Sequence, residues 1–447
     1  MSEINRRRLL GAAGLGLAAL PLSAASARAA GDPRGAAGTD EPADHGRIGL
    51  GPGTVTTGAE RQARDGWSEL RGQRVGIITN PTGILRDRRS IVDEMVGSGA
   101  VNVVAVFGPE HGFRGTAQAG SSEGTSTDPR TGVTVYDAYG ASADKLAGMF
   151  RTARVETVVF DIQDVGARFY TYIWTMYTAM RAAVATGARF VVLDRPNPVG
   201  GTARGPMMTK PWESGVGLKE IVQAHGMSVG ELARFFDGEF LEADAGGRLT
   251  ELTVVAVRGW RRDVPYAGTG LPWVMPSPNM PTPDTALVYP GMGMFEGTLL
   301  SEGRGTTRPF ELIGAPWVDY RWAERLSALD LPGAAFREAY FTPTFNKFVN
   351  TVCGGVQVEV TDPGRFDPMR VGVEMLVAAR ALYPQFGWRY DSYDPARPYW
   401  IDKITGSTRL RDMVSAGASA DEVTGAWAQE LSAFERARKP YLLYPGA

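Results

Sequence analysis

A glutamate and a histidine, Glu110 and His111, stand side by side in the segment VFGPEHGFRG (106–115), between glycines that permit sharp backbone turns. A positioned carboxyl group can give or take a proton, and a neighbouring imidazole can orient it or bind substrate. A structural role is the alternative, in which both side chains cap the next element or bond to a nearby loop. The elements around this turn decide between the two interpretations.

Polar side chains follow several apolar runs in the first half of the chain. The runs and the residues at their ends are 74–80 with Asn80, 101–108 before Glu110, 155–161 with Asp161 and Asp164, and 189–195 with Asp194, Arg195 and Asn197. Continuous apolar runs of this length are typical of strands buried on both faces. A fifth strand is expected at 251–257.

Segments between the runs carry apolar residues at three- and four-residue spacing, which predicts helices at 88–100 and 171–188. Alternating strands and helices indicate an α/β fold, with a Rossmann-like three-layer domain and a mostly parallel sheet. Ligands of such sheets bind beyond the carboxyl ends of the strands. We therefore expect the polar residues at the strand ends to converge on one crevice.

The second half has a different composition. Residues 268–317 are rich in Pro, Gly and aromatic residues, and we expect this loop-rich stretch to fold over the crevice and form a wall of the pocket. A strand at 354–360 and a helix at 371–384 predict a smaller C-terminal α/β domain. The expected organisation is an export signal at 1–29, a flexible lead-in at 30–60, a Rossmann-like catalytic domain at 61–258 and a C-terminal domain closing the cleft at 259–447.

The first residues predict export. Three consecutive arginines precede an apolar stretch rich in Ala, Gly and Leu, and small residues follow up to Ala29. Adjacent arginines and modest hydrophobicity favour the twin-arginine route. The mature protein is expected to be extracytoplasmic (secreted, periplasmic or cell-wall associated), with no stable membrane insertion; an uncleaved anchor is the alternative.

Composition narrows the class of function. Hydrophobic residues make up 43% and charged residues 21%, as in soluble globular proteins, and the single cysteine, Cys353, excludes an intramolecular disulfide. A net charge of −2 without a long basic block disfavours a nucleic-acid partner. Neither a dinucleotide nor a nucleoside-triphosphate motif follows a predicted strand. The chain has three histidines, too few for a His-rich zinc site, so no metal and no cofactor are expected.

Ser122 in GSSEG (120–124) matches a serine-hydrolase pattern, but the strand and helix that this pattern requires do not flank it. Ser228 and Glu231 in HGMSVGELA form a capping box at the start of a helix. Both motifs are set aside as catalytic signals. His225, just before that helix, can still face the crevice.

Several long motifs resemble those of one family. They are FGPEHGFRGTAQAG, DIQDVGARFYTYIWTM, LDRPNPVGG, HGMSVGELA, PSPNMPT, FEGTLLSEGRGTTRPFELIGAPW and the terminal YLLYP. In order and content they are similar to the exo-β-N-acetylmuramidases of the NamZ type, which form glycoside hydrolase family 171. The resemblance runs from about residue 66 to the C-terminus. It implies a Rossmann-like domain and a smaller C-terminal domain with the active site in the cleft between them.

The resemblance also implies release of terminal N-acetylmuramic acid from the non-reducing ends of peptidoglycan fragments, with Glu110 as the leading catalytic residue. Glycoside hydrolysis generally needs two carboxyl groups. Desolvation by Phe107 and Phe113 could keep Glu110 protonated as a general acid. Asp161 and Asp164 are the nearest second carboxylates by topology, Glu302 is another contender, and His111 completes the catalytic candidates.

Muramic acid carries a lactyl ether with a carboxylate, which an arginine can hold with two parallel hydrogen bonds. The substrate-binding candidates are Asn80, Arg168, Tyr170, His225, Asn279, Glu302, Arg304 and Thr306, with Arg308, Trp273 and Trp317 as further possibilities. Salt bridges within loops and aromatic core packing are the alternatives for these residues. Arg204 and Glu359 depart from residues common in relatives, which puts fine substrate preference in doubt.

Two other functions compete with a muramidase. A non-catalytic protein that binds muropeptides would keep the pocket without the chemistry, although Glu110, Asp161 and Asp164 favour the enzyme. An amidase or esterase would need a nucleophile that the sequence does not convincingly supply.

Overall fold

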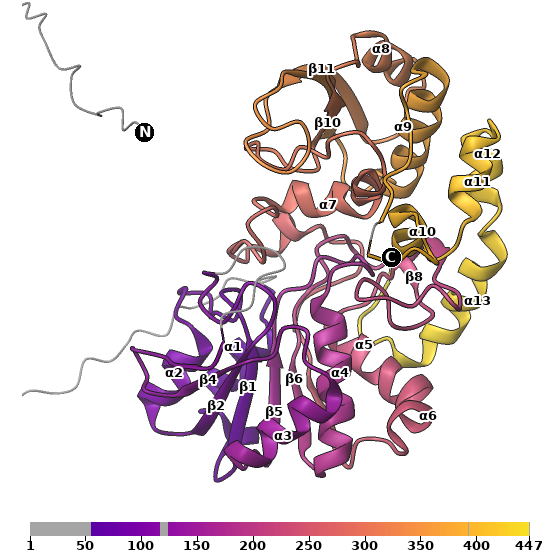
Figure 1. Ribbon diagram of the computed structural model, residues 1–447. Helices are drawn as coiled ribbons and strands as arrows, with labels where there is room; N and C mark the ends of the chain where they lie inside the picture. Colours follow the sequence, from indigo (N-terminus) through magenta and orange to yellow (C-terminus); the bar gives the residue numbers. More distant parts are fainter. Residues whose placement is uncertain (1–54, 117–123, 392, 447) are drawn as a thin grey trace, which may run out of the picture. The chain divides into compact units, whose positions relative to one another are not determined.

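A seven-stranded sheet with the order β3-β4-β2-β1-β5-β6-β9 forms the centre of the first half of the chain (Figure 1). The computed structural model describes residues 55–116, 124–391 and 393–446. The strands are β1 (Arg74–Thr79), β2 (Asn102–Gly108), β3 (Ser126–Thr127), β4 (Thr134–Asp137), β5 (Thr157–Asp161), β6 (Arg189–Leu193) and β9 (Leu252–Val255). All neighbouring strands are parallel except β3 and β4, which confirms the predicted α/β class with a mostly parallel sheet.

Helices cover both faces of this sheet. They are α1 (Gly58–Arg64), α2 (Ile91–Ser98), α3 (Ala143–Ala153), α4 (Tyr172–Thr186), α5 (Val229–Phe236) and α6 (Glu242–Ala245). Successive side chains of a strand point to opposite faces. Accordingly Ile78 and Phe160 pack with α3 and α4, whereas Ile77 and Val159 pack with α1 and α2. The result is the predicted three-layer arrangement.

Helix boundaries follow local chemistry. Ser142 caps α3 by accepting from the Lys145 amide, and Ser228 and Glu231 form the predicted capping box of α5. Helix α4 ends at Gly187, whose φ of 72° is in the left-handed region that glycine tolerates.

The five predicted strands occur as β1, β2, β5, β6 and β9, and the two predicted helices occur as α2 and α4.

Residues 55–60 belong to the folded structure, although the sequence placed them in a flexible lead-in. Thr56 forms a β-bridge with Arg258, and α1 begins at Gly58 with Thr57 as its cap. A Cβ atom at Gly58 would lie 2.2 Å from the Val255 carbonyl oxygen, so only glycine permits this close approach to β9. The proposed export signal at 1–29 lies outside the described residues.

The second half is built around a three-stranded antiparallel sheet with the order β10-β12-β11. These strands are Leu312–Ala315 (β10), Ala334–Phe341 (β11) and Cys353–Val360 (β12). The helices are α7 (Pro283–Met292), α8 (Arg321–Ser327), α9 (Pro368–Leu382), α10 (Trp400–Thr405), α11 (Arg409–Ser415), α12 (Ala420–Gly425) and α13 (Ala428–Arg438). The strand at 354–360 and the helix at 371–384 were predicted, but α7 and the 3-10 helix η4 (Gly293–Gly297) lie in a stretch expected to be loops.

The C-terminal tail packs against the first half. The Tyr444 hydroxyl donates to the Asp194 carboxylate just beyond β6, and the Leu443 amide donates to Glu231 of α5. A two-stranded sheet of β7 (Arg204–Met207) and β8 (Val222–Ala224) lies in the same part of the sequence as α5. Residues 55–446 thus belong to one compact unit, which contains all of the strand-end loops.

Candidate active site

The turn after β2 presents Glu110 and His111. The Gly112 amide donates to the Pro109 carbonyl oxygen at 2.9 Å, which closes the turn. His111 and Gly112 both have left-handed backbones, with φ of 71° and 77°. A Cβ atom at Gly108 would lie 2.9 Å from the Phe113 amide nitrogen, so the turn requires glycine there. A histidine held in this region is a feature that often marks a functional site.

Glu110 and His111 line a cavity of about 150 Å³. The other lining residues come from the loop before α4, from residues 216 and 277–279, and from α7 to the segment after η4; they are Phe169, Tyr170, Thr171, Tyr172, Val216, Ser277, Asn279, Tyr289, Glu296 and Arg304. Sites for larger organic ligands commonly reach several hundred cubic ångströms. The size of this cavity therefore suits a single sugar residue.

Hydroxyl groups surround the Glu110 carboxyl. The Thr171 hydroxyl donates to its Oε2 at 2.8 Å. Burial and the negative charge of Glu110 raise the pKa of the neighbouring Tyr139 phenol. A threonine hydroxyl can donate or accept, so the contact with Thr171 can persist when Glu110 releases or takes up a proton. One carboxyl oxygen is thereby held in place.

Glu296 and Arg304, from the second half of the chain, line the same cavity. Arg304 Nη2 donates to Glu296 Oε1 at 2.7 Å, and the guanidinium lies 5.0 Å from the centre of the Phe310 ring. Burial lowers the pKa of Arg304, but Glu296 and Glu302 outweigh that effect, so the net change is upward and the side chain stays cationic.

Five residues predicted from the sequence line this cavity, and they are Glu110, His111, Tyr170, Asn279 and Arg304. Tyr170 packs edge-to-face against Tyr172 and Tyr289, with ring centres 5.1 and 5.7 Å apart. The stretch 268–317 supplies the wall that was expected of it through Ser277, Asn279 and the residues from Tyr289 onward.

Asp161, predicted as a catalytic carboxylate, does not line this cavity. It is fully buried, and its Oδ1 and Oδ2 accept from Arg195 Nε and Nη2 at 2.5 and 2.9 Å. A carboxylate held with both oxygens by a buried guanidinium is not free to exchange protons with substrate. The pair joins the ends of β5 and β6.

Asn80 is likewise occupied with the neighbouring strand end. Its Oδ1 accepts from the Thr82 amide and hydroxyl at 2.9 and 2.6 Å. The Thr82 hydroxyl in turn accepts from the Gln163 amide at 2.8 Å. These bonds tie the loop after β1 to the loop after β5, so Asn80 supports the site without lining the cavity.

Asp164 and His225 form a buried pair behind the cavity. His225 Nδ1 accepts from the Met227 amide at 3.2 Å, so the proton of a neutral ring is on Nε2, which lies 3.1 Å from Asp164 Oδ2. Asp164 Oδ2 also accepts from the Gly166 amide at 2.7 Å. Neither residue lines the cavity, and their contacts shape the loop that carries Tyr170 and Thr171.

Arg168, predicted to bind substrate, does not line this cavity and is bonded to backbone groups. The side chain is fully buried, and its guanidinium donates to the carbonyl oxygens of Pro206, Ile221 and Ile404. Burial lowers its pKa to about 9. All three acceptors are backbone groups, so Arg168 links the loop after β5 to β7, to the residue before β8 and to α10.

The other substrate-binding candidates at residues 302–308 have partners within their own part of the chain. Glu302 is buried, and its carboxylate pairs with Lys347 Nζ at 2.8 Å and accepts from Asn346 at 2.6 Å. The Thr306 hydroxyl donates to the Gly303 carbonyl oxygen at 2.6 Å, which closes a turn. Arg308 pairs with Glu311 at 2.8 Å. These three side chains brace the loop and do not line the cavity.

The predicted aromatic platforms lie elsewhere. Trp273 packs against Tyr266, and Trp317 packs against Tyr383, at 4.9 and 5.5 Å between ring centres. The two departures from the family pattern are ion-paired, Arg204 with Asp367 at 3.1 Å and Glu359 with Arg337 at 3.6 Å. Ser122 lies outside the described residues.

Glu296 is the lining carboxyl group that the sequence did not single out. Its segment, GMFEG, has no strand end before it and reads as one of many Gly-rich turns. The sequence did offer one indication, because Glu296 and Arg304 lie close together in the chain on either side of the LLS segment. Thr171 and Tyr289 were also missed, since nothing local separates them from core residues.

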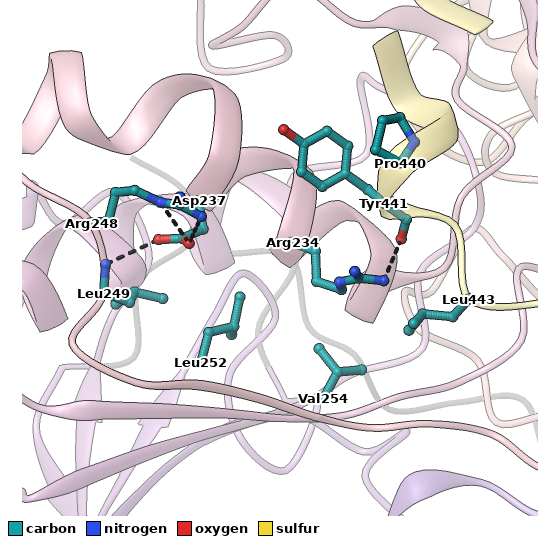
Figure 2. A pocket seen from close by; sticks show the side chains of 9 residues that line it. All are labelled: Arg234, Asp237, Arg248, Leu249, Leu252, Val254, Pro440, Tyr441 and Leu443. Carbon is teal, nitrogen blue, oxygen red and sulfur yellow. Dashed lines mark hydrogen bonds and ion pairs between the residues drawn. The ribbon is translucent and has the colours of Figure 1, made fainter. Parts of the chain in front are cut away.

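A larger hollow of about 510 Å³ lies beside β9 and the C-terminal tail (Figure 2). Its lining carboxyl group, Asp237, accepts from Arg248 Nη2 at 2.6 Å and from the Leu249 amide at 3.0 Å. Arg234 donates to the Tyr441 carbonyl oxygen at 3.1 Å. With its carboxyl group occupied, this hollow has less to offer acid–base chemistry than the smaller cavity.

Within the described part of the chain, no cluster of three or more His, Cys, Asp or Glu side chains is placed to hold a metal ion. Nor does any described helix have the length and hydropathy that crossing a membrane requires. Cys353 is buried, and burial raises the pKa of its thiol to about 11.

A Rossmann-like α/β protein with an acid–base residue, Glu110, in a cavity of one-sugar size beyond the carboxyl end of β2 has the construction expected of an enzyme that acts on a small ligand. Comparison with known proteins agrees. Two family models match, "Exo-beta-N-acetylmuramidase NamZ, N-terminal" over residues 75–284 and "Exo-beta-N-acetylmuramidase NamZ, C-terminal" over residues 287–444. The chain belongs to the NamZ family.

The chain is 43% identical to the peptidoglycan β-N-acetylmuramidase NamZ of Bacillus subtilis (strain 168) over 393 residues, which cover 87% of this chain and 91% of that protein. Two crystal structures of DUF1343 family proteins from Bacteroides fragilis share the fold. One has a TM-score of 0.78 at 32% identity, covering 88% of this chain and all of the other, and the second has a TM-score of 0.68 at 30% identity, covering 88% and 99%. The two family models meet between residues 284 and 287, whereas the boundary at 258/259 stays a prediction.

Proposed function

We propose that this protein is an exo-acting glycosidase that releases terminal N-acetylmuramic acid from the non-reducing ends of peptidoglycan fragments. The observation that carries the proposal is the placement of Glu110, on a turn that requires glycine, in a cavity sized for one sugar residue. The B. subtilis relative bears the name of this activity.

Glu110 serves as the general acid in this proposal. Its carboxyl donates a proton to the glycosidic oxygen as the bond to the anomeric carbon breaks, so the aglycone leaves as an alcohol. Water supplies the hydroxyl that the anomeric carbon gains, and the proton that this water loses replaces the one that Glu110 gave. Thr171 holds one oxygen of the carboxyl throughout. His111 and Asn279, which line the same cavity, are placed to hydrogen-bond the sugar.

The proposal includes the location of the substrate. Peptidoglycan lies outside the cytoplasmic membrane, and the arginine-led apolar segment at residues 1–29 has the composition of an export signal. We propose that the mature protein works outside the cytoplasm, free or associated with the cell wall. Fractionation of cells that express the full chain tests this, because retention of activity in the cytoplasm would contradict it.

The test of the chemistry uses aryl β-N-acetylmuraminides with leaving groups of graded pKa. For a poor leaving group, Glu110→Gln is expected to lower kcat/KM by about 10²- to 10⁴-fold, since the leaving oxygen needs a proton. The loss should shrink as the leaving group improves. Asp161→Asn serves as a carboxylate control outside the cavity, once its folding has been checked.

Undiminished hydrolysis by Glu110→Gln, or a loss that does not depend on the leaving group, would contradict the role of Glu110. Binding of N-acetylmuramic acid by the wild type without any turnover would instead identify a binding protein.

A further inference from the structure

The cation that lines the Glu110 cavity is Arg304. Among the described lining residues the charged side chains are Glu110, Glu296 and Arg304, together with the ionisable His111. Arg168 and Arg308 were the other candidates to bind an anionic substrate. They do not line the cavity, and they bond to backbone carbonyl groups and to Glu311, respectively. An anion that enters this cavity therefore meets one guanidinium.

Surrounding groups hold that guanidinium in a fixed plane. Glu296 Oε1 binds Nη2 at 2.7 Å, Glu302 Oε1 lies 3.4 Å from Nε, and the Phe310 ring covers one face at 5.0 Å. Only 21% of the Arg304 side chain is exposed. A planar donor that is already ordered loses little rotamer freedom when a ligand binds, which favours affinity.

Donor capacity remains on Arg304. A guanidinium carries five N–H groups, of which Glu296 takes one on Nη2. Nη1 has no hydrogen-bond acceptor among the residues that the structure describes. Glu302, which could compete for it, lies 2.8 Å from Lys347 Nζ through Oε2 and accepts from Asn346 through Oε1 at 2.6 Å. One edge of the fork is thus left for a ligand.

We propose that Arg304, oriented by Glu296, binds the lactyl carboxylate of the terminal sugar and so determines the preference for N-acetylmuramic acid over N-acetylglucosamine. The inference rests on the proposed function and names the group that sets its substrate class. N-Acetylglucosamine has the same ring and acetamido group but lacks this carboxylate. Glu296 is a positioning residue, because it acts through Arg304.

The test is a cycle of two enzymes and two ligands. Wild type and Arg304→Met are assayed on an aryl β-N-acetylmuraminide and on its lactyl methyl ester, which keeps the bulk and loses the charge. The wild type is expected to prefer the free acid by roughly 10- to 100-fold in kcat/KM, as for a hydrogen-bonded charge. Arg304→Met should lose that preference, because only the free acid uses the guanidinium, so its kcat/KM should fall more on the free acid than on the ester.

The proposal would be overturned if Arg304→Met lowered kcat/KM equally on both substrates and so kept the preference of the wild type. Glu296→Gln should raise KM for the free acid by roughly 3- to 10-fold with little change in kcat, and should raise KM for the ester less than KM for the free acid. Arg304→Lys keeps the charge but not the fork, and should restore part of the preference. Arg321→Met removes an exposed arginine paired with Asp319 and serves as the matched control.

Direct binding separates this inference from the proposed function. Calorimetry compares free N-acetylmuramic acid with its methyl ester on wild type and Arg304→Met, and thermal unfolding confirms that each variant is folded. If the wild type hydrolyses neither glycoside but prefers the free acid through Arg304, the proposed activity fails and the inference stands. If the wild type hydrolyses the muraminide and Arg304→Met still discriminates acid from ester, the inference fails and the activity stands.

Discussion

Polar residues at the strand ends of β1, β5 and β6 differ from those around the Glu110 cavity in what they bind. Asp161 is held with both oxygens by Arg195, and the Asn80 side-chain oxygen accepts from Thr82, although Asn80 Nδ2 is buried without a hydrogen-bond partner among the described residues. Glu110 and Arg304 also have partners, but their side chains face a cavity formed by loops from both halves of the chain. The paired strand ends stabilise the fold, whereas the Glu110 cavity can receive a ligand.

The difference shows why a polar strand end is not by itself a site. Burial makes an unpaired charge costly, so a strand end packed under other loops must acquire a partner. The end of β2 escapes this because its glycine-dependent turn projects Glu110 into the cavity. Mutations should therefore change stability in the supporting region and catalysis or specificity in the cavity.

The largest effect on stability is expected from breaking the ion pair of Asp161. Arg195→Ala leaves a fully buried carboxylate without its partner, and should lower the free energy of unfolding by about 3–5 kcal/mol. Denaturant unfolding measures this, with Arg321→Ala, an exposed pair, expected to cost at most about 1 kcal/mol. A catalytic defect in Arg195→Ala without a loss of stability would place the strand ends in the chemistry and break the comparison.

Asp194 gives the supporting region a pH dependence. Burial raises its pKa to about 6, so the folded state binds a proton there more tightly than the unfolded chain. Stability from this group is therefore present at low pH and is lost as the pH rises from about 4 to about 6, by up to about 3 kcal/mol. Unfolding of wild type and Asp194→Asn across this range measures the effect, and an equal slope in both proteins would contradict it.

Thr171 offers the smallest and most local change. Its hydroxyl makes no cap bond to α4 and instead donates to Glu110, so Thr171→Val should leave stability nearly unchanged. We expect kcat to fall about tenfold with little change in KM, because one oxygen of the acid loses its support. Thr178→Val removes a hydroxyl from the same helix, bonded to the Trp174 carbonyl oxygen, and is the control. Equal effects of the two variants on kcat would remove Thr171 from the site.

Much of the fold could be predicted from the sequence, because buried parallel strands appear as unbroken apolar runs. β1, β5 and β6 lie within two residues of their predicted limits. The short strands β3 and β4 have no such run and were missed. Helix α7 was missed because Pro290 lies inside it and glycines follow it.

The site could be predicted only where a local sequence feature marks it. Glu110 and His111 stand out because glycines flank them, and five of the predicted residues do line the cavity. Whether Asp161 or Arg168 binds a partner or a ligand depends on residues such as Arg195 and Ile404, which are remote in sequence. Side-chain pairing of this kind is decided by tertiary packing and leaves no local pattern.

The most direct measurement is a crystal structure of Glu110→Gln soaked with a muramic acid β-glycoside. The account predicts a single muramic acid residue in the cavity between Thr171 and Arg304. Its glycosidic oxygen should lie within about 3.2 Å of the substituted side chain at position 110, where the native carboxyl can pass a proton. The same sugar seated in the hollow beside β9, or held in the cavity with its anomeric carbon turned away from position 110, would contradict it.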